Sequence, residues 1–256
     1  MEELKTTYLF GIKPLDTLLE GMFPGELILL GSEHKAGRST LGLHLAIYNA
    51  LNKSPSAYFS FIYNQGQMQK KIYNIFSAVD KSKTAAPEAQ KILGQAAENL
   101  AKAPLYLEIT ENENRTNDKF LKKLEKEIAT KALKLIILDD LSMLFPIEKS
   151  PLLFEEEMGV LVRGLKALAL QKEVLIFVTV PLNSNASIND DSNVTYARGL
   201  GFTSELETVS DRVLYLYKDY ASKNNQRNIF LLKNNNKKKG TAVLDFDETK
   251  GCFSAN

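Results

Sequence analysis

The sequence predicts an α/β fold with a mainly parallel central sheet, helices on both of its faces, and an antiparallel β extension at the C-terminal end. Three observations lead to this prediction. Several short segments are apolar throughout, as buried parallel strands are. Segments with helical periodicity alternate with them along the chain. The stretch from residue 212 to residue 246 instead holds three β-type segments in succession.

Short apolar or alternating runs, bounded by glycine, proline or polar residues, predict the strands. Gly25–Gly31 is the first and has a glycine at both ends. The turn Asn234–Gly240 joins the last two strands and indicates that they are antiparallel. The predicted strands are Gly25–Gly31, Ala57–Ile62, Leu105–Ile109, Leu135–Leu138, Val174–Val180, Arg212–Tyr217, Asn228–Lys233 and Thr241–Phe246.

Apolar residues at helical spacing predict helices between these strands. In the first helix, Leu41, Leu45 and Tyr48 fall on one face. Asn183–Asn193, rich in asparagine, serine and aspartate, is instead predicted to be a mobile loop. The predicted helices are Ser39–Leu51, Gln65–Val79, Glu88–Lys102, Asp118–Lys131 and Leu152–Gln171.

Length and composition favour one large domain over residues 1–256, since 44% of the residues are hydrophobic and 25% are charged. The net charge of +1 excludes a strong overall field for nucleic acid, so any basic surface must be local. No apolar run has the length of a membrane span, and the first residues do not resemble a signal peptide. Cys252 is the one cysteine, which excludes an internal disulfide. We therefore expect a cytoplasmic protein.

The segment Ser32–Thr40 has the composition of a phosphate-binding turn. It follows a predicted strand and precedes a predicted helix, so the N–H groups of the turn and of the helix N-terminus would point at a bound anion. Compared with the pattern G-x-x-x-x-G-K-[ST], Gly37 and Ser39 match, whereas Ser32 replaces the first glycine and Arg38 replaces the lysine. The predicted nucleotide-binding residues are Ser32, Glu33, His34, Lys35, Ala36, Gly37, Arg38, Ser39 and Thr40.

Arg38 changes the chemistry of this turn. Lysine is a compact charge that reaches between terminal phosphates, whereas arginine is a bulky planar fork that would hold phosphate in a different position. Glu33 adds a negative charge to a loop that would receive an anion. The same residues also fit an ordinary turn between a strand and a helix, and that alternative stays open at this point.

Longer stretches connect the chain to a known family. The series Thr7–Leu19, followed by Gly25–Leu30, resembles the start of the ATPase domain of RecA-like proteins. Later stretches are similar to the C-terminal motor domain of replicative DNA helicases of the DnaB type, and their order along the chain is more specific than any one of them. These stretches are Leu135–Leu144, Arg163–Ala169, Ser210–Asp219 and Leu231–Phe246. The resemblance implies a RecA-like P-loop fold that binds ATP or ADP together with Mg²⁺.

The resemblance also implies a magnesium site and a contact with a neighbouring subunit. Asp139 matches the carboxylate that holds Mg²⁺ through water, and Ser39 matches the hydroxyl that ligates the same ion. Lys233 matches a lysine that the family sends from the last hairpin into the neighbour's site.

At other positions where the family carries catalytic groups, this chain has different residues. Ile62 falls at the position of the glutamate that activates water, and Pro181 at that of a polar sensor. Asn235 falls at the position of the arginine finger, and Arg38 at that of the lysine. Because the loss of one such group typically lowers the rate by orders of magnitude, ATP hydrolysis near the background rate is expected.

The last turn of the chain is basic. It carries Lys237, Lys238 and Lys239, with Lys233 nearby. These side chains would contact phosphates of DNA or of a nucleotide, or a neighbouring subunit, or they would form a solvated hairpin tip.

Three functions fit the sequence. The first is a divergent DnaB-like module that binds a nucleotide or a partner in DNA replication or repair, with little or no ATP hydrolysis. The second is an active ATP-dependent DNA helicase, which requires a multimeric ring. The third is a structural or regulatory protein that binds no nucleotide and needs no cofactor.

The expected partners are a second copy of the chain or a replication protein. DNA binding is left open, and no membrane partner is expected. Only six residues precede the first stretch of the resemblance, so the N-terminal domain of the helicases is not expected.

Overall fold

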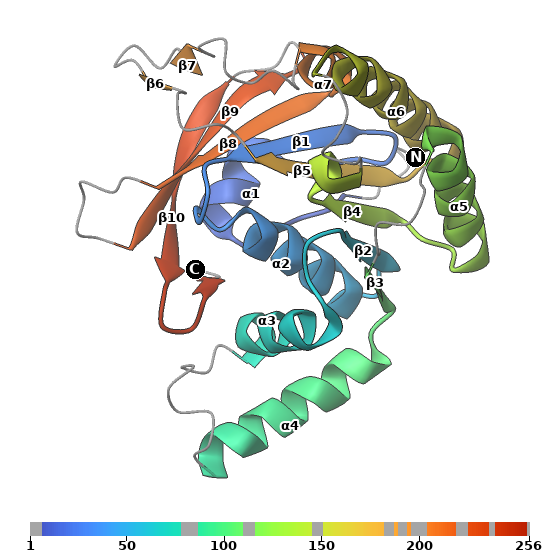
Figure 1. Ribbon diagram of the computed structural model, residues 1–256. Coiled ribbons are helices and arrows are strands. Elements are labelled where there is room, and N and C mark those ends of the chain that lie inside the picture. The colour runs from blue at the N-terminus through green and yellow to red at the C-terminus, as the bar shows by residue number, and fades with distance from the viewer. Residues whose placement is uncertain are drawn as a thin grey trace, which may run out of the picture.

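A nine-stranded β-sheet forms the centre of the computed structural model (Figure 1). The structure describes residues 7–77, 87–109, 116–144, 151–181, 187–188, 194–195, 204–218, 225–235 and 239–254. From one edge to the other, the strands are β11 (Cys252–Phe253), β10 (Gly240–Asp247), β9 (Gln226–Asn234), β8 (Arg212–Tyr217), β1 (Leu27–Ser32), β5 (Leu175–Pro181), β4 (Leu135–Asp139), β2 (Ser56–Ser60) and β3 (Leu105–Ile109). A separate small sheet pairs β6 (Ser187–Ile188) with β7 (Val194–Thr195).

The strands from β8 to β3 run parallel, as their apolar sequences predict. β1 lies in the interior of the sheet: Leu29 pairs with Val213 of β8 on one side and with Val178 of β5 on the other. Every residue of β1 is buried. Because the carboxyl ends of parallel strands meet at one edge, the turn that follows β1 lies beside the ends of β4 and β5.

Helices cover both faces of the sheet (Figure 1). One face is covered by α1 (Lys13–Leu19), α2 (Arg38–Leu51) and α3 (Gln65–Ser77). The other face is covered by α5 (Asn117–Thr130), the 3₁₀ helix η2 (Leu141–Leu144), α6 (Pro151–Lys172) and α7 (Ser204–Val209). Successive side chains of a strand point to opposite faces of the sheet. Ile137 of β4 therefore packs in the core under α1, α2 and α3, and Ile136 packs in the core under α5, α6 and α7.

Helix α4 (Pro87–Lys102) packs against α3 and α2 rather than on the sheet (Figure 1). Among the helices that the structure describes, none combines the length and the apolar character needed to cross a membrane.

The antiparallel extension consists of β8, β9, β10 and β11 in order. The predicted α/β class, with a mainly parallel sheet and an antiparallel C-terminal extension, is therefore confirmed. Cys252 lies in β11 as a buried free thiol.

All predicted strands and helices are present among the described residues, with ends that differ by a few residues. The sequence patterns did not predict α1, α7, η2 or the short strands β6, β7 and β11, because elements this short show little periodicity. β6 lies within Asn183–Asn193, the segment predicted to be a mobile loop. The other residues of that segment lie outside the described residues.

Arg212 of β8 ties the end of α1 to the sheet although its side chain is only 2% exposed. Its guanidinium donates to Glu26 Oε1 at 2.9 and 3.2 Å. It also donates to the carbonyl oxygens of Leu19 and Gly21, each at 2.7 Å. Because a buried charge without partners costs several kcal/mol, these contacts hold α1, β1 and β8 in one arrangement.

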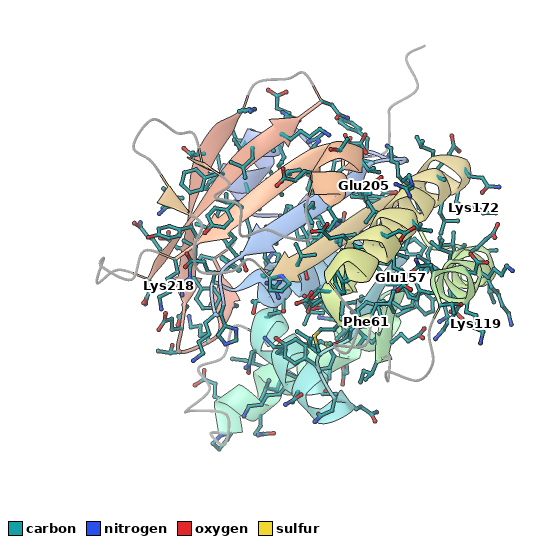
Figure 2. All side chains as sticks on the ribbon, turned by 45° about the horizontal axis from the view of Figure 1, so that its top comes forward. Phe61, Lys119, Glu157, Lys172, Glu205 and Lys218 are labelled. Atoms are coloured by element: carbon teal, nitrogen blue, oxygen red, sulfur yellow. The ribbon has the colours of Figure 1, made fainter. Side chains whose placement is uncertain are left out.

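Replacement of Arg212 by methionine is expected to lower the free energy of unfolding by about 3–5 kcal/mol, because Glu26 and two carbonyl groups would lose their partner. Urea unfolding followed by circular dichroism measures this loss. Arg163→Met is the matched control, since Arg163 of α6 pairs at the surface with Glu205 of α7. Figure 2 labels Glu205. That control should lose less than about 1 kcal/mol. Equal losses in the two variants would contradict the role assigned to Arg212.

Candidate functional site

The segment Ser32–Thr40 comprises the last residue of β1, a turn of five residues and the start of α2. Gly37 caps α2 with a φ of 110°, which favours glycine, and Lys35 takes a φ of 63°. A Cβ atom on Gly37 would also lie 3.0 Å from the ring of Phe253. Both constraints explain the glycine at this position. The first N–H groups of α2 have no partner within the helix and therefore lie beside the turn as free donors for a ligand.

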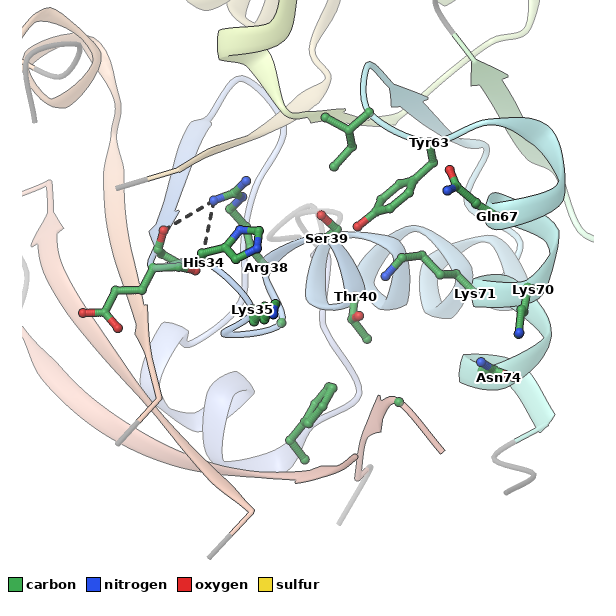
Figure 3. A pocket seen from close by; sticks show the side chains of 16 residues that line it. His34, Lys35, Arg38, Ser39, Thr40, Tyr63, Gln67, Lys70, Lys71 and Asn74 are labelled. Carbon is green, nitrogen blue, oxygen red and sulfur yellow. Dashed lines mark hydrogen bonds between the residues drawn. The ribbon is translucent and has the colours of Figure 1, made fainter. Parts of the chain in front are cut away.

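An open pocket of about 610 Å³ lies beside this turn (Figure 3). Eight of the nine residues predicted to bind nucleotide line it, and Ala36, which is 1% exposed, does not. The other lining residues come from the segment after β2, from α3 and from the C-terminal extension: Ile62, Tyr63, Gln67, Lys70, Lys71, Asn74, Phe246 and Gly251. The volume is that of a small-molecule site. The turn is thus open and is not filled by its own side chains.

More cations than anions line the pocket. Lys35, Arg38, Lys70 and Lys71 carry positive charge, and Glu33 is the one carboxylate among the described lining residues. Figure 3 shows Lys71 extending from α3 towards the start of α2. Together with the positive N-terminus of α2, these charges favour a ligand that carries phosphate.

The guanidinium of Arg38 is engaged within the protein. Its Nη2 donates to Asp140 Oδ2 at 2.9 Å, and its Nη1 lies 3.4 Å from both the carbonyl and the hydroxyl oxygen of Ser32 (Figure 3). The side chains of Arg38 and Asp140 are 12% and 6% exposed. Burial raises the pKa of Asp140, whereas Arg38 and hydrogen bonds from Ser142 oppose this rise. A phosphate in the pocket would therefore compete with Asp140 for Arg38.

Asp139, the last residue of β4, is fully buried and accepts hydrogen bonds from three hydroxyl groups. Ser39 donates to Oδ1 at 3.1 Å, and Thr179 of β5 donates to the same oxygen. Tyr58 of β2 donates to Oδ2 at 2.5 Å. Burial, and then the neighbouring Asp139, raise the pKa of Tyr58 well above its usual value, so the phenol stays a donor at neutral pH. We call Asp139 and these three donors the hydroxyl cluster.

The structure brings together Ser39 and Asp139, the two residues predicted to share Mg²⁺. Ser39 lines the pocket, but Asp139 is not among the lining residues. In the part of the chain that the structure describes, no group of three or more histidine, cysteine, aspartate or glutamate side chains is placed to hold a metal ion. The metal stays a prediction.

The antiparallel extension supports the turn from the other side. Arg227 of β9, which is 1% exposed, donates to the carbonyl of Ala36 at 3.1 Å and to Glu248 at 2.9 Å. Its guanidinium lies 4.7 Å from the ring of Phe246, which packs edge-to-face on Phe253. The backbone of the turn is therefore held by residues from the opposite end of the chain.

The positions predicted to have lost catalytic groups differ in their surroundings. Ile62 lines the pocket, and 36% of the residue is exposed. Pro181 is paired with Ser32 at the ends of β5 and β1. Asn235 instead donates from its side-chain amide to Asp211 Oδ1 at 3.0 Å. None of these three side chains can act as a base or carries a positive charge.

The lysines of the last hairpin are only partly described. Lys233 donates to two carbonyl oxygens at the end of α7, each at 2.8 Å. Lys239 is exposed, and Lys237 and Lys238 lie outside the described residues. Their contact with DNA or with a neighbouring subunit stays a prediction.

Sequence reasoning missed several residues of the site. Thr179 places a hydroxyl in the otherwise apolar strand β5, and that was the available signal, whereas Tyr58 stands in β2 between two serines and gave none. For Lys70 and Lys71, the available signal was that they form an adjacent basic pair in a predicted helix. Arg227 gave no signal, because its contact with the turn depends on the packing of β9.

Comparison with known proteins identifies relatives of this fold. A family model for the DnaB-like helicase C terminal domain matches residues 9–255. One solved structure, of an ATPase domain, superposes with a TM-score of 0.83 and 17% sequence identity, over 97% of this chain and 90% of that chain. A DnaB-like replicative helicase, solved to show its interactions with primase, gives a TM-score of 0.82 and 18% identity, over 98% of this chain and 62% of that chain. No curated protein matches the sequence significantly.

The two solved structures show the fold of this chain, whereas the family model shows its family. At 17% and 18% identity, the two structures show a shared fold, and this chain spans less than two thirds of the second one. The family model covers β1, the turn, both cores and the antiparallel extension in one continuous match. The chain therefore belongs to the family of DnaB-like helicase C-terminal domains.

Proposed function

We propose that this protein is a DnaB-like module that binds a nucleotide in the pocket beside Ser32–Thr40 and hydrolyses ATP little or not at all. One observation carries the proposal. The pocket is open and rich in cations, whereas Ile62 presents an alkyl side chain at the position that the resemblance assigns to the catalytic base.

Nucleotide binding is supported by the pocket itself. Four basic side chains and the N-terminus of α2 surround space of the size of a small-molecule site. The family to which the chain belongs binds ATP, and the pocket lies at the turn through which the family's motif contacts phosphates.

Weak hydrolysis is supported by the side chains around the pocket. A water that attacks phosphate needs a group that orients it and accepts its proton, and an isoleucine side chain offers neither. Pro181 cannot supply the polar contact of a sensor. Asn235 carries no charge and is bound to Asp211. Developing negative charge on the phosphate would thus lack the groups that normally stabilise it.

The family membership also bears on partners. One similar structure concerns a DnaB-like replicative helicase and its interactions with primase. By this likeness, we propose a second copy of the chain or a replication protein as the partner, in DNA replication or repair. The exposed Lys239 is available for a contact with DNA phosphates or with a neighbour.

An active ATP-dependent helicase is the second candidate. The match to the helicase family model over residues 9–255 favours it. It requires a different group in the role of the base, and a multimer that encloses DNA. The two candidates differ in ATP turnover, which is directly measurable.

The purified protein is expected to release phosphate from radiolabelled ATP at a rate near the uncatalysed background, since a missing base and a missing cation each lower rates by about 10² or more. Single-stranded DNA should leave this rate unchanged. Asp139→Ala is the control for contaminating enzymes, because it should not alter a background rate. ATP hydrolysis well above the background rate that is stimulated by DNA and disappears in Asp139→Ala would establish the active helicase instead.

Asp140→Asn is expected to tighten ADP binding by about tenfold, because the variant weakens the ion pair that holds Arg38 and leaves the guanidinium for phosphate. Isothermal titration calorimetry with ADP measures the change in Kd. Glu205→Gln is the matched control: it weakens the ion pair with Arg163, neither residue of which lines the pocket, and should leave Kd unchanged.

The same titrations test the proposed function. Absence of ADP binding in both the unmodified protein and Asp140→Asn would exclude a nucleotide site and favour the interaction protein without a nucleotide. Weaker binding in Asp140→Asn would instead give Asp140 a direct part in holding the ligand.

A further inference from the structure

Magnesium at a phosphate site depends on oxygen atoms that can accept from its bound waters. Mg²⁺ keeps near-octahedral coordination, retains several waters, and is held by one or two carboxylates together with phosphate oxygens. The resemblance assigns the water-mediated contact to Asp139 and the direct one to Ser39. The acceptor capacity of Asp139 therefore decides whether these residues fit the metal.

The carboxylate of Asp139 has little capacity left to accept further hydrogen bonds. A carboxylate accepts about four hydrogen bonds, roughly two at each oxygen. Oδ1 already accepts from Ser39 and Thr179, and Oδ2 accepts from Tyr58 at 2.5 Å. Asp139 is 0% exposed and does not line the pocket, so a metal-bound water can reach its carboxylate only in the place of one of these donors.

The donors of the hydroxyl cluster are not easily displaced. Tyr58 is 1% exposed and Thr179 is 0% exposed, so neither hydroxyl has water as a substitute partner. Leaving such a buried hydroxyl without an acceptor costs about 1–3 kcal/mol. A metal-bound water that took the place of Thr179 would meet this cost in full, whereas Tyr58 would keep one weaker acceptor, the carbonyl oxygen of Ser39 at 3.3 Å. The residues present therefore do not fit a water-mediated Mg²⁺ at Asp139.

The neighbouring carboxylate does not replace Asp139. Asp140 accepts at Oδ2 from Arg38, and at Oδ1 from the backbone N–H and the hydroxyl of Ser142. Its side chain is 6% exposed, and it is also missing from the lining of the pocket.

Positive charge for phosphate is available without a metal. Lys35 lines the pocket from the turn, and Lys70 and Lys71 line it from α3 (Figure 3). An ammonium group donates directly to phosphate oxygens and needs no carboxylate to hold it in place. These lysines lie on two walls of the pocket, so they can contact a phosphate chain from two sides.

We propose that this pocket binds its nucleotide without Mg²⁺, with Tyr58 and Thr179 occupying the carboxylate of Asp139 and with lysines of the turn and of α3 neutralising the phosphates. The inference rests on the proposed function, because it concerns the same pocket. It makes Tyr58 a residue that determines metal dependence, although Tyr58 does not touch the ligand.

The test is the affinity for ADP, measured by isothermal titration calorimetry in excess Mg²⁺ and again in EDTA. In the unmodified protein the two Kd values should differ by less than about threefold. Tyr58→Phe removes only the hydroxyl and frees Oδ2 of Asp139. This variant should bind ADP about tenfold more tightly in Mg²⁺ than in EDTA, since one hydrogen bond from a metal-bound water to a charged carboxylate is worth about a factor of ten in affinity.

Tyr8→Phe is the matched control, because Tyr8 is also 1% exposed but lies outside the pocket. It should behave as the unmodified protein does. If Tyr58→Phe does not fold, Thr179→Val frees the other oxygen and carries the same expectation.

Each outcome bears on the inference. Binding in the unmodified protein that is about tenfold or more tighter in Mg²⁺ would overturn it and leave the proposed nucleotide site intact. Equal Kd values in Mg²⁺ and EDTA for the folded variants would overturn the role of the hydroxyl cluster. Absence of ADP binding under both conditions would overturn this inference and the proposed function together.

Discussion

The buried carboxylate of Asp139 is the constraint on which the geometry of the site depends. A carboxylate that is 0% exposed must be hydrogen-bonded, because its burial would otherwise cost several kcal/mol. Its donors come from three elements: Ser39 from α2, Tyr58 from β2 and Thr179 from β5. These bonds hold the start of α2 against the ends of the central strands. The position of the turn between β1 and α2 follows, since it has only five residues.

Under the proposed function, nucleotide binding and ATP hydrolysis would depend on different parts of this molecule. The shape of the pocket depends on packing: Arg227 holds the carbonyl of Ala36, and a Cβ atom at residue 37 would lie only 3.0 Å from the ring of Phe253. The resemblance places the groups that hydrolysis needs close to the ends of strands, at positions such as 62 and 181. Substitutions at those ends change the chemistry without disturbing the two cores, so a family fold with an open pocket is compatible with a site that lacks catalytic groups.

Prediction from sequence worked best where an element shows its own pattern. β1, β4 and β5 are apolar throughout and were predicted as parallel strands, and the turn after β1 was placed beside a helix that begins within one residue of its predicted start. The sequence pattern did not predict α1, whose seven residues include Pro14, or the two-residue strand β11. Isolated side chains were the hardest to assign. Lys233 was expected at a neighbour's site, and within this chain it donates to the end of α7.

The sequence alone determined the order of strands and helices, the apolar faces, and the turn Ser32–Thr40 with its arginine, because each of these depends on residues close together in the chain. Only the tertiary structure decided what the charged groups of that turn contact. Tyr58 and Asp139 are 81 positions apart, and Arg38 and Asp140 are 102 apart. Hydrogen bonds between such residues form only after β1, β2, β4 and β5 have paired in register, and no local periodicity encodes them. The acceptor capacity left at Asp139 is therefore a property of the folded sheet.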